Sequence, residues 1–308
     1  MYLGFDFLIS KNNLPLLLEV NIGLPGGVFE YDLAYRTIHN KPSTVYDLIE
    51  NIAQSKYQKG FNKYIHSLEY KEELTALKLW IDGARAFPKK YSPILRLEDK
   101  WVQYQLLYNN GFPLPHTELY DPKDKGQVAS LLKRFGKFVI KPRSGRHGRG
   151  MKIIDSINSF PSDKPSQIPF ILQEYVECKV EDYHYSVRSV SFDEEFICLI
   201  GYIAKGNITY EGSTVLIESG EDVTLRDREF NIVNYPQMSW EGEIWYKGKI
   251  PNHLTENLIG ERVADTILYL PEYTINEIKE ISKQIGKLYM NLNFNKLPMA
   301  WFEKGNNL

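Results

Sequence analysis

Asp6, Glu19 and Asn21, near the start of the chain, have the residue types and spacing of a metal site. They lie in two runs that alternate like strands, and Asn12 and Asn13 between the runs favour a tight hairpin turn. Such a hairpin places Asp6 opposite Glu19, where two carboxylates repel each other. A bound Mg²⁺ would explain the arrangement, because it takes carboxylate and amide oxygens together with substrate phosphates. The alternative, from the hairpin alone, is a solvated face that carries two acids by chance. The apolar face is expected to consist of Phe5, Phe7, Ile9, Leu16, Leu18 and Val20.

A glycine-rich loop at 144–150 is the second chemical signal. Its glycines, Gly145, Gly148 and Gly150, let the backbone approach a ligand closely, and exposed N–H groups in such a loop bind anions. The loop lacks a Walker sequence, and it lacks the strand–turn–helix context of a dinucleotide fingerprint. Alone it is no more than a flexible hairpin tip. The preceding strand, which ends at Lys141, makes a phosphate-binding loop the more specific interpretation.

The elements that must position these residues follow from periodicity and from turn-forming residues. We expect helices near 29–37, 44–54, 98–108 and 275–290, and a helical connector over 55–95. Strands are expected at 117–120, 137–141, 151–155, 169–176, 185–192, 195–204 and 298–302.

The composition is that of a soluble globular protein, with 43% hydrophobic and 25% charged residues among 308. A net charge of −2 gives no support to attraction by nucleic acid or by a membrane surface. No apolar run reaches the length of a membrane span, and only two cysteines, Cys178 and Cys198, are present, which leaves no disulfide framework. We therefore expect a cytoplasmic protein without nucleic-acid or membrane partners.

Several motifs, taken in order, resemble the nucleotide-binding lobe of the ATP-grasp superfamily of carboxylate–amine ligases. The segment 111–117 is similar to the family's G-x-P-x-P-x-T segment, and it follows a helix that carries Lys100. Val139-Ile140-Lys141-Pro142 resembles the strand whose lysine contacts the α- and β-phosphates, and the loop 144–150 resembles the flap over the triphosphate. Together these motifs identify a candidate ATP site.

The remaining motifs resemble the hinge and the second lobe of that family. The run 173–177 is similar to the hinge that reads adenine, and 186–188 is similar to the strand whose arginine holds a phosphate. The resemblance implies catalytic roles for Arg188 and Lys141 and metal binding by Asp6, Glu19 and Asn21. It implies ATP binding by Lys100, Lys141, Arg143, Ser144, Gly145, Gly148, Gly150, Gln173, Glu174, Tyr175, Val176 and Asp182.

The resemblance implies an α+β fold in which two α/β lobes with antiparallel sheets grip a nucleotide. It also implies an ATP-dependent ligase that uses ATP and Mg²⁺ or Mn²⁺. Such an enzyme joins a small-molecule or peptide carboxylate to an amine through an acylphosphate, with release of ADP and phosphate. Two alternatives are a small-molecule kinase on the same fold and a catalytically incomplete nucleotide-binding module. The oligomeric state stays open, a homodimer included.

The order of the motifs departs from that family, in which the metal-binding strands close the domain. Here they come first, and a circular permutation is one explanation. It divides the chain into a metal-binding hairpin with helices (1–60), a helical connector (61–96), a nucleotide lobe with the flap (97–175) and a second lobe with a C-terminal helix (176–308). The alternative is the tail of an upstream tandem module followed by a second, truncated module. We favour permutation, which predicts that 275–302 packs against the N-terminal hairpin.

Overall fold

The computed structural model describes residues 1–22, 25–66, 93–124, 126–145, 148, 150–160, 169–206, 212–235 and 261–303. Most of the expected connector, and Arg146, His147 and Arg149 of the expected flap, lie outside these residues. The chain divides into two compact units. Unit 1 is Met1–Pro15, Val20–Leu68 and Glu177–Asn291, and unit 2 is Leu16–Glu19, Glu69–Val176 and Leu292–Leu308. Within the described ranges, no helix has the length and apolar character needed to span a bilayer.

A nine-stranded sheet forms the centre of unit 1. Its main path runs β11-β13-β10-β9-β8-β1-β2, with β12 beside β13 and β7 beside β8. The strands are β1 (Tyr2–Ile9), β2 (Pro15–Ile22), β7 (Lys179–Val180), β8 (Tyr183–Phe192), β9 (Glu195–Ala204), β10 (Ser213–Gly220), β11 (Thr224–Leu225), β12 (Ile232–Tyr235) and β13 (Glu261–Pro271). The β1–β8 and β8–β9 pairs are antiparallel, whereas β10 and β13 are parallel. The N-terminal strand is therefore an interior strand of this sheet.

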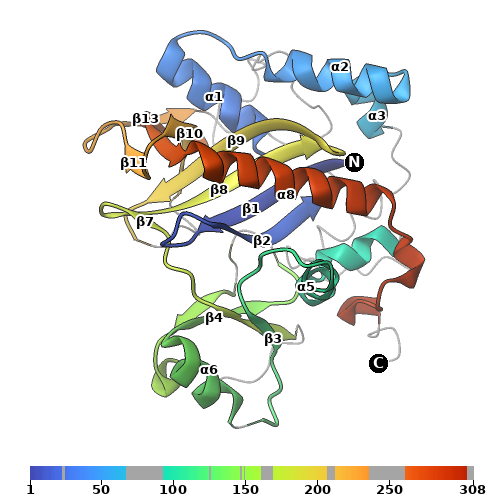
Figure 1. Cartoon of the computed structure of the whole chain (residues 1–308), viewed down its shortest axis with the longest axis vertical. Helices are drawn as coiled ribbons and strands as arrows, with labels where there is room; N and C mark the ends of the chain where they lie inside the picture. Colours follow the sequence, from blue (N-terminus) through green and yellow to red (C-terminus); the bar gives the residue numbers. More distant parts are fainter. Residues whose placement is uncertain are drawn as a thin grey trace. The chain divides into compact units, whose positions relative to one another are not determined.

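Helices cover both faces of the sheet in unit 1. They are α1 (Val28–His39), α2 (Val45–Tyr57), α3 (Phe61–His66) and α8 (Glu272–Met290). Ser282 of α8 donates a hydrogen bond to Ser189 of β8 (3.0 Å), and α8 crosses the strands in Figure 1. The next residue, Val190, packs in a core with Val28 of α1 and Ile49 of α2. Because side chains alternate along a strand, α8 lies on one face, and α1 and α2 lie on the other.

The helix α8 packs against β1 and is fixed to the hairpin turn by a hydrogen bond from Thr274 Oγ1 to the Asn13 carbonyl (2.7 Å). The strand expected at 298–302 is wrong, because 298–300 have no strand pairing and 301–303 form a 3₁₀ turn. Pro298 cannot donate to a ladder. The segment is held instead by hydrogen bonds to side chains, such as that from the Trp301 N–H to Asp99 (2.9 Å).

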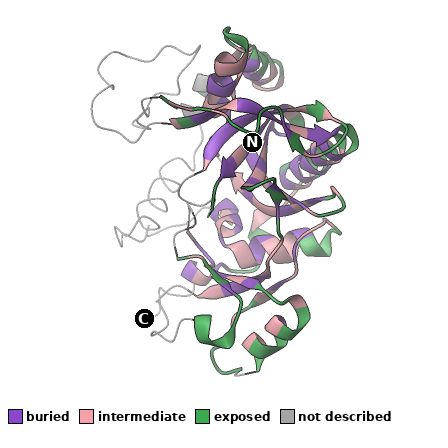
Figure 2. Ribbon diagram, turned by 90° about the vertical axis from the view of Figure 1, so that its left-hand side faces the viewer, coloured by how far each residue is buried: buried purple, intermediate pink, exposed green. Residues whose placement is uncertain are grey.

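The sheet of unit 2 has four antiparallel strands in the order β3-β6-β4-β5. They are β3 (Thr117–Leu119), β6 (Phe170–Glu174), β4 (Phe138–Pro142) and β5 (Lys152–Ile154). The other elements are η2 (Pro93–Glu98), α5 (Lys100–Asn109), α6 (Gln127–Phe135), η3 (Ile157–Ser159) and η6 (Phe294–Lys296). Leu131 of α6 packs on Phe138, Ile140 and Leu172 of the sheet. In Figure 2 the buried residues concentrate along the strands.

The hairpin β1–β2 forms as expected, but its turn and its apolar face differ from the prediction. The Ser10 N–H donates to Leu14 O, and Asn13, with a φ of 59°, donates to Ser10 O. In β2, Leu17 is buried, whereas the expected core residues Leu16 and Leu18 are only partly buried. Val20 is buried again, so the alternation shifts by one residue between positions 17 and 20. The predicted face at Leu16 and Leu18 is therefore wrong.

Candidate nucleotide and metal sites

The candidate site in unit 1 lies where α1 begins against β8. Gly27 has a φ of 111°, and a Cβ there would lie 2.8 Å from Val190 Cγ2. Only glycine fits this close approach. The Gly27 N–H donates to Glu30 Oε2 (2.7 Å), which satisfies one of the free N–H groups at the helix start. This packing brings the carbonyl of Pro25 to the guanidinium of Arg188 (2.8 Å).

Arg188 and Asp6 are cross-strand partners on β8 and β1 and form a bidentate ion pair. Arg188 Nε lies 2.6 Å from Asp6 Oδ1, and its second contact to Oδ2 is 2.9 Å long. The guanidinium carbon lies 5.4 Å from the centre of the Tyr202 ring. The side chains of Arg188 and Asp6 are 18% and 17% exposed, so both reach solvent. A charge-assisted pair of this geometry is strong yet remains accessible to a ligand.

Asn21 joins this pair through its amide, which donates to Asp6 Oδ2 (3.0 Å). The structure therefore brings together three of the sequence-predicted residues: Asp6, Asn21 and Arg188. Among the residues described, no group of three or more His, Cys, Asp or Glu side chains is arranged to hold a metal ion. The oxygens of an aspartate and an asparagine nevertheless suit a hard cation such as Mg²⁺.

Glu261, at the start of β13, is an acidic residue that the sequence did not single out. Burial, and then the charge of Glu30, raise the pKa of its carboxyl to about 7. It is paired in register with Tyr235 of β12. No motif surrounds it, so only the sheet topology could have placed it near the start of α1.

Glu19, the remaining predicted metal ligand, forms an ion pair with Lys100 in unit 2. Lys100 opens α5, and its backbone N–H donates to the carbonyl of Arg143 (2.8 Å). The strand β2 also meets the G-x-P-x-P-x-T segment, because the Leu17 N–H donates to Pro113 O (2.9 Å). Each predicted metal-binding carboxylate thus has a cationic partner within the chain. Repulsion between Asp6 and Glu19 therefore does not by itself require a metal.

Lys141 lies on β4, buried and in register with Ile171 of β6. Two residues further along β6, Gln173 donates from its amide to Thr117 Oγ1 (2.9 Å). Glu174 accepts from the His116 N–H at 3.2 Å. These hydrogen bonds tie the end of β6, where the expected adenine-reading run begins, to the neighbouring strand β3 and to the residue before it.

The glycines of the expected phosphate loop all have positive φ: 150° at Gly145, 64° at Gly148 and 74° at Gly150. A Cβ on Gly150 would lie 2.9 Å from Pro142 Cγ, so the return of the loop onto β4 requires glycine there. The sequence pattern anticipated these positions because only glycine adopts such φ values without strain.

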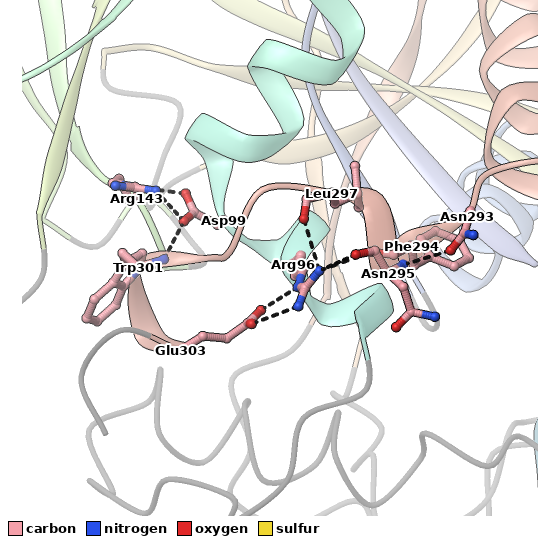
Figure 3. Close-up of polar contacts among 9 residues, drawn as sticks. All are labelled: Arg96, Asp99, Arg143, Asn293, Phe294, Asn295, Leu297, Trp301 and Glu303. Carbon is pink, nitrogen blue, oxygen red and sulfur yellow. Dashed lines mark hydrogen bonds and ion pairs between the residues drawn. The ribbon is translucent and has the colours of Figure 1, made fainter. Parts of the chain in front are cut away.

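Arg143, which was predicted to contact ATP, forms a buried bidentate pair with Asp99. Its Nε and Nη2 atoms lie 2.9 and 2.6 Å from the two carboxylate oxygens (Figure 3). Ser144, also predicted to contact ATP, accepts a hydrogen bond from Trp301 Nε1 (2.8 Å). The side chains of both residues are therefore engaged within unit 2. No sequence signal indicated the part played by Trp301.

The expected hinge residues lie where the central segment of unit 2, Glu69–Val176, ends and the chain continues into unit 1 at Glu177. The ring of Tyr175 lies 5.8 Å from Lys137 Nζ. Asp182, the predicted ribose contact, is exposed in the turn between β7 and β8 of unit 1. The structure gives neither residue a contact that would identify a nucleotide role.

One comparison with known proteins, that with family models, agrees with the motifs. Residues 97–233 match the family of the ATP-grasp domain. A solved structure of the ATP-grasp ligase PsnB, complexed with a phosphomimetic variant of minimal precursor, Mg and ADP, is 18% identical, with a TM-score of 0.29. The similarity covers 54% of this chain and 50% of that one, so the chain spans about half of that structure. A search of curated proteins found no match. The match over residues 97–233 makes this part of the chain similar to an ATP-grasp domain.

Proposed function

We propose that this protein is an ATP-dependent ligase that joins a carboxylate to an amine through an acylphosphate and releases ADP and phosphate. The observation that carries the proposal is the accessible Arg188–Asp6 pair with Asn21 beside it. It combines a phosphate-binding cation with two oxygen ligands for a metal. The ATP-grasp domain over residues 97–233 supports the nucleotide as one substrate.

The donor set fits Mg²⁺ by its chemistry. Asp6, Glu19 and Asn21 offer two carboxylates and an amide, which are hard oxygen ligands. None of the three proposed ligands is a soft thiolate. When bound, the metal neutralises charge on the transferring phosphoryl group. We propose that these three residues hold it.

The ion pairs of Asp6 and Glu19 support an exchange of partners when the nucleotide binds. Arg188 neutralises Asp6 in unit 1, and Lys100 neutralises Glu19 in unit 2. Both pairs are partly exposed, so separating them leaves no fully buried charge without a partner. In the proposed complex, the carboxylates bind the metal and the two cations bind phosphate oxygens. Each charge thereby keeps an opposite charge beside it.

The proposed reaction has two steps. An oxygen of the substrate carboxylate attacks the γ-phosphorus in line, an O–P bond forms, the bond to the bridging oxygen breaks, and ADP leaves. The amine nitrogen then attacks the acyl carbon, the bond to the phosphate oxygen breaks, and phosphate leaves with the amine proton. Lys141 and Arg188 stabilise the charge on the phosphoryl oxygens, so the protein contributes positioning and electrostatics.

We also propose that the chain is a circular permutant. In support, β1 pairs with β8, the strand of Arg188, along Tyr2–Phe7, and α8 packs against β1. The ion pair between Glu19 and Lys100 further supports it, because it links the N-terminal hairpin to the nucleotide-lobe helix. In a truncated tandem arrangement, Asp6 and Arg188 would belong to different modules, and no shared site would be expected.

The test measures phosphate release with pools of carboxylates and amines, with and without Mg²⁺. The wild-type protein should release phosphate only when ATP, Mg²⁺ and a suitable acid and amine are present. Glu19→Gln should abolish this turnover, whereas Glu280→Gln, a matched change on the exposed face of α8, should not. Turnover that survives Glu19→Gln combined with Asn21→Ala would refute the metal assignment.

Two other results would replace the proposal. Formation of ADP without free phosphate or amine dependence would indicate a small-molecule kinase. Binding of an ATP analogue without turnover on any acid would indicate a nucleotide-binding module.

A further inference from the structure

Asp99 is a fully buried carboxylate with four hydrogen-bond donors around it (Figure 3). Oδ1 accepts from Arg143 Nε (2.9 Å) and from the Trp101 N–H (3.0 Å). Oδ2 accepts from Arg143 Nη2 (2.6 Å) and from the Trp301 N–H (2.9 Å). The carboxylate thus joins the start of α5, the residue after β4 and a distant C-terminal segment. A buried charge satisfied in this way holds its partners rigidly.

The C-terminal segment 292–303, here called the clasp, belongs to unit 2 and is bound there by Arg96 of η2. The guanidinium forms a bidentate pair with Glu303, at 2.8 and 3.1 Å. It also donates to the carbonyls of Asn295 (3.1 Å) and Leu297 (2.9 Å). Figure 3 shows these bonds converging on Arg96 from both ends of the clasp. The position of Trp301 is therefore fixed by contacts on either side of it.

Trp301 connects the clasp to the residue that precedes the glycines of the candidate phosphate loop. Its indole Nε1–H donates to Ser144 Oγ (2.8 Å), and Ser144 is only 2% exposed. Its backbone N–H binds the same carboxylate that holds Arg143. The neighbouring Lys100 N–H donates to the Arg143 carbonyl (2.8 Å). Arg143 and Ser144 are thus held by side chain and backbone at once.

We propose that Trp301 is a positioning residue for nucleotide binding, acting through Ser144, and that Arg143 is a positioning residue acting through Asp99. This inference rests on the proposed ATP-dependent function. The two contacts set the start of the loop in the conformation that receives phosphate, and they hold Lys100 beside it. Fixing the loop before the ligand arrives reduces the ordering cost of binding. Arg143 is then a brace for the site and makes no contact with ATP.

The decisive variant is Trp301→Phe, which keeps an aromatic ring and the backbone N–H but removes the indole donor. The loss of one neutral hydrogen bond should weaken binding of a non-hydrolysable ATP analogue about three- to tenfold. The KM for ATP should rise while kcat changes less than about twofold. Trp101→Phe is the matched control, because its ring stacks on Tyr104 at 5.6 Å and should leave affinity unchanged.

A double-mutant cycle with Ser144→Ala tests the route of the effect. If Trp301 acts through Ser144, Trp301→Phe should cause no further loss in the Ser144→Ala background. An equal loss in both backgrounds, or unchanged affinity in Trp301→Phe, would overturn the inference.

A spectroscopic measurement keeps the inference testable if Trp301→Phe fails to fold. The indole ¹⁵N–¹H resonance that moves in Ser144→Ala should also move when the ATP analogue is added to the wild-type protein. A resonance unmoved by nucleotide would overturn the inference. A wild-type protein that binds no ATP analogue at all would refute the proposed function instead, so the two failures are distinguishable.

Discussion

Among the residues that the structure describes, each unit has an aspartate–arginine pair of bidentate geometry, and the two pairs have different surroundings. In unit 2 the Asp99 carboxylate is 0% exposed and receives two backbone N–H groups besides Arg143. In unit 1 the Asp6 side chain is 17% exposed, and its other partner is the side-chain amide of Asn21. In unit 2, the main-chain N–H groups of Trp101 and Trp301 complete the hydrogen bonding of the pair. The pair in unit 1 has partners that a ligand can replace.

This difference shows that a bidentate arginine is not by itself evidence for a ligand site. Arg143 and Arg188 have the same type of partner; Arg143 was expected to contact ATP, and Arg188 was expected to hold a phosphate as a catalytic residue. The backbone donors around Asp99 support the proposed structural brace, because a carboxylate that loses such a pair is left as a buried charge without compensation. The partial exposure of Asp6 and Arg188 is consistent with the proposed exchange of partners with metal and phosphate. Four predictions test this contrast.

The largest effect is expected for Arg143→Ala. Removing the guanidinium leaves the Asp99 carboxylate buried with two backbone donors only. The free energy of unfolding should fall by about 3–5 kcal/mol. Urea denaturation followed by circular dichroism measures it, with Arg134→Ala on α6 as the control. A loss below about 1 kcal/mol would show that the pair is not the brace of unit 2.

The second prediction concerns Arg188→Ala in unit 1. Turnover should fall about a hundredfold, because a cation that stabilises the phosphoryl group is lost. The loss of unfolding free energy should be smaller than in Arg143→Ala, since Asp6 is accessible to water. Phosphate release and urea denaturation on the same sample give both quantities. A larger stability loss than that of Arg143→Ala would reverse the assignment of brace and site.

The third prediction concerns Lys141, the proposed phosphate-binding residue of unit 2. Lys141→Ala should weaken binding of a non-hydrolysable ATP analogue by about 1.5–3 kcal/mol through loss of one charge-assisted contact. Isothermal titration calorimetry measures the change. Lys152→Ala on the neighbouring strand β5, in register with Ile140, is the matched control, and its side chain is exposed. Equal affinities for Lys141→Ala and the wild type would exclude Lys141 from the phosphate site.

The local features of the fold could be predicted from the sequence because their signals are local. The helix expected at 98–108 forms as α5 over Lys100–Asn109, and its N-cap Asp99 accepts from the Trp101 N–H. The helix expected at 275–290 forms over Glu272–Met290. In contrast, β10 and β13 were missed, because their parallel pairing joins segments far apart in the chain.

The sequence predicted the residue types of the candidate site more completely than the contacts that those residues make. Asp6 and Arg188 were identified separately, yet nothing in either motif indicates that they are cross-strand neighbours. The brace at Asp99 was missed for the same reason, because Trp301 lies 202 residues away in sequence. The shift in β2 between Leu17 and Val20 is a property of packing, which strict alternation cannot express.

The smallest effect concerns Glu261, a carboxyl group to which the described part of the chain supplies no counterpart of the donors around Asp99. Burial, and then Glu30, raise the pKa of Glu261 from 4.5 to about 7. Between these values the folded protein binds more protons at this group than the unfolded chain does. Its contribution to stability is therefore complete below about pH 4.5 and is lost as the pH rises through about 7.

Urea midpoints for the wild type should include this decline in stability with pH. Glu261→Gln should remove the decline, whereas Glu280→Gln on the exposed face of α8 should retain it. An identical pH profile in Glu261→Gln and the wild type would show that Glu261 titrates as an ordinary surface acid. The polar region at the start of α1 would then be as well solvated as the Asp6–Arg188 pair.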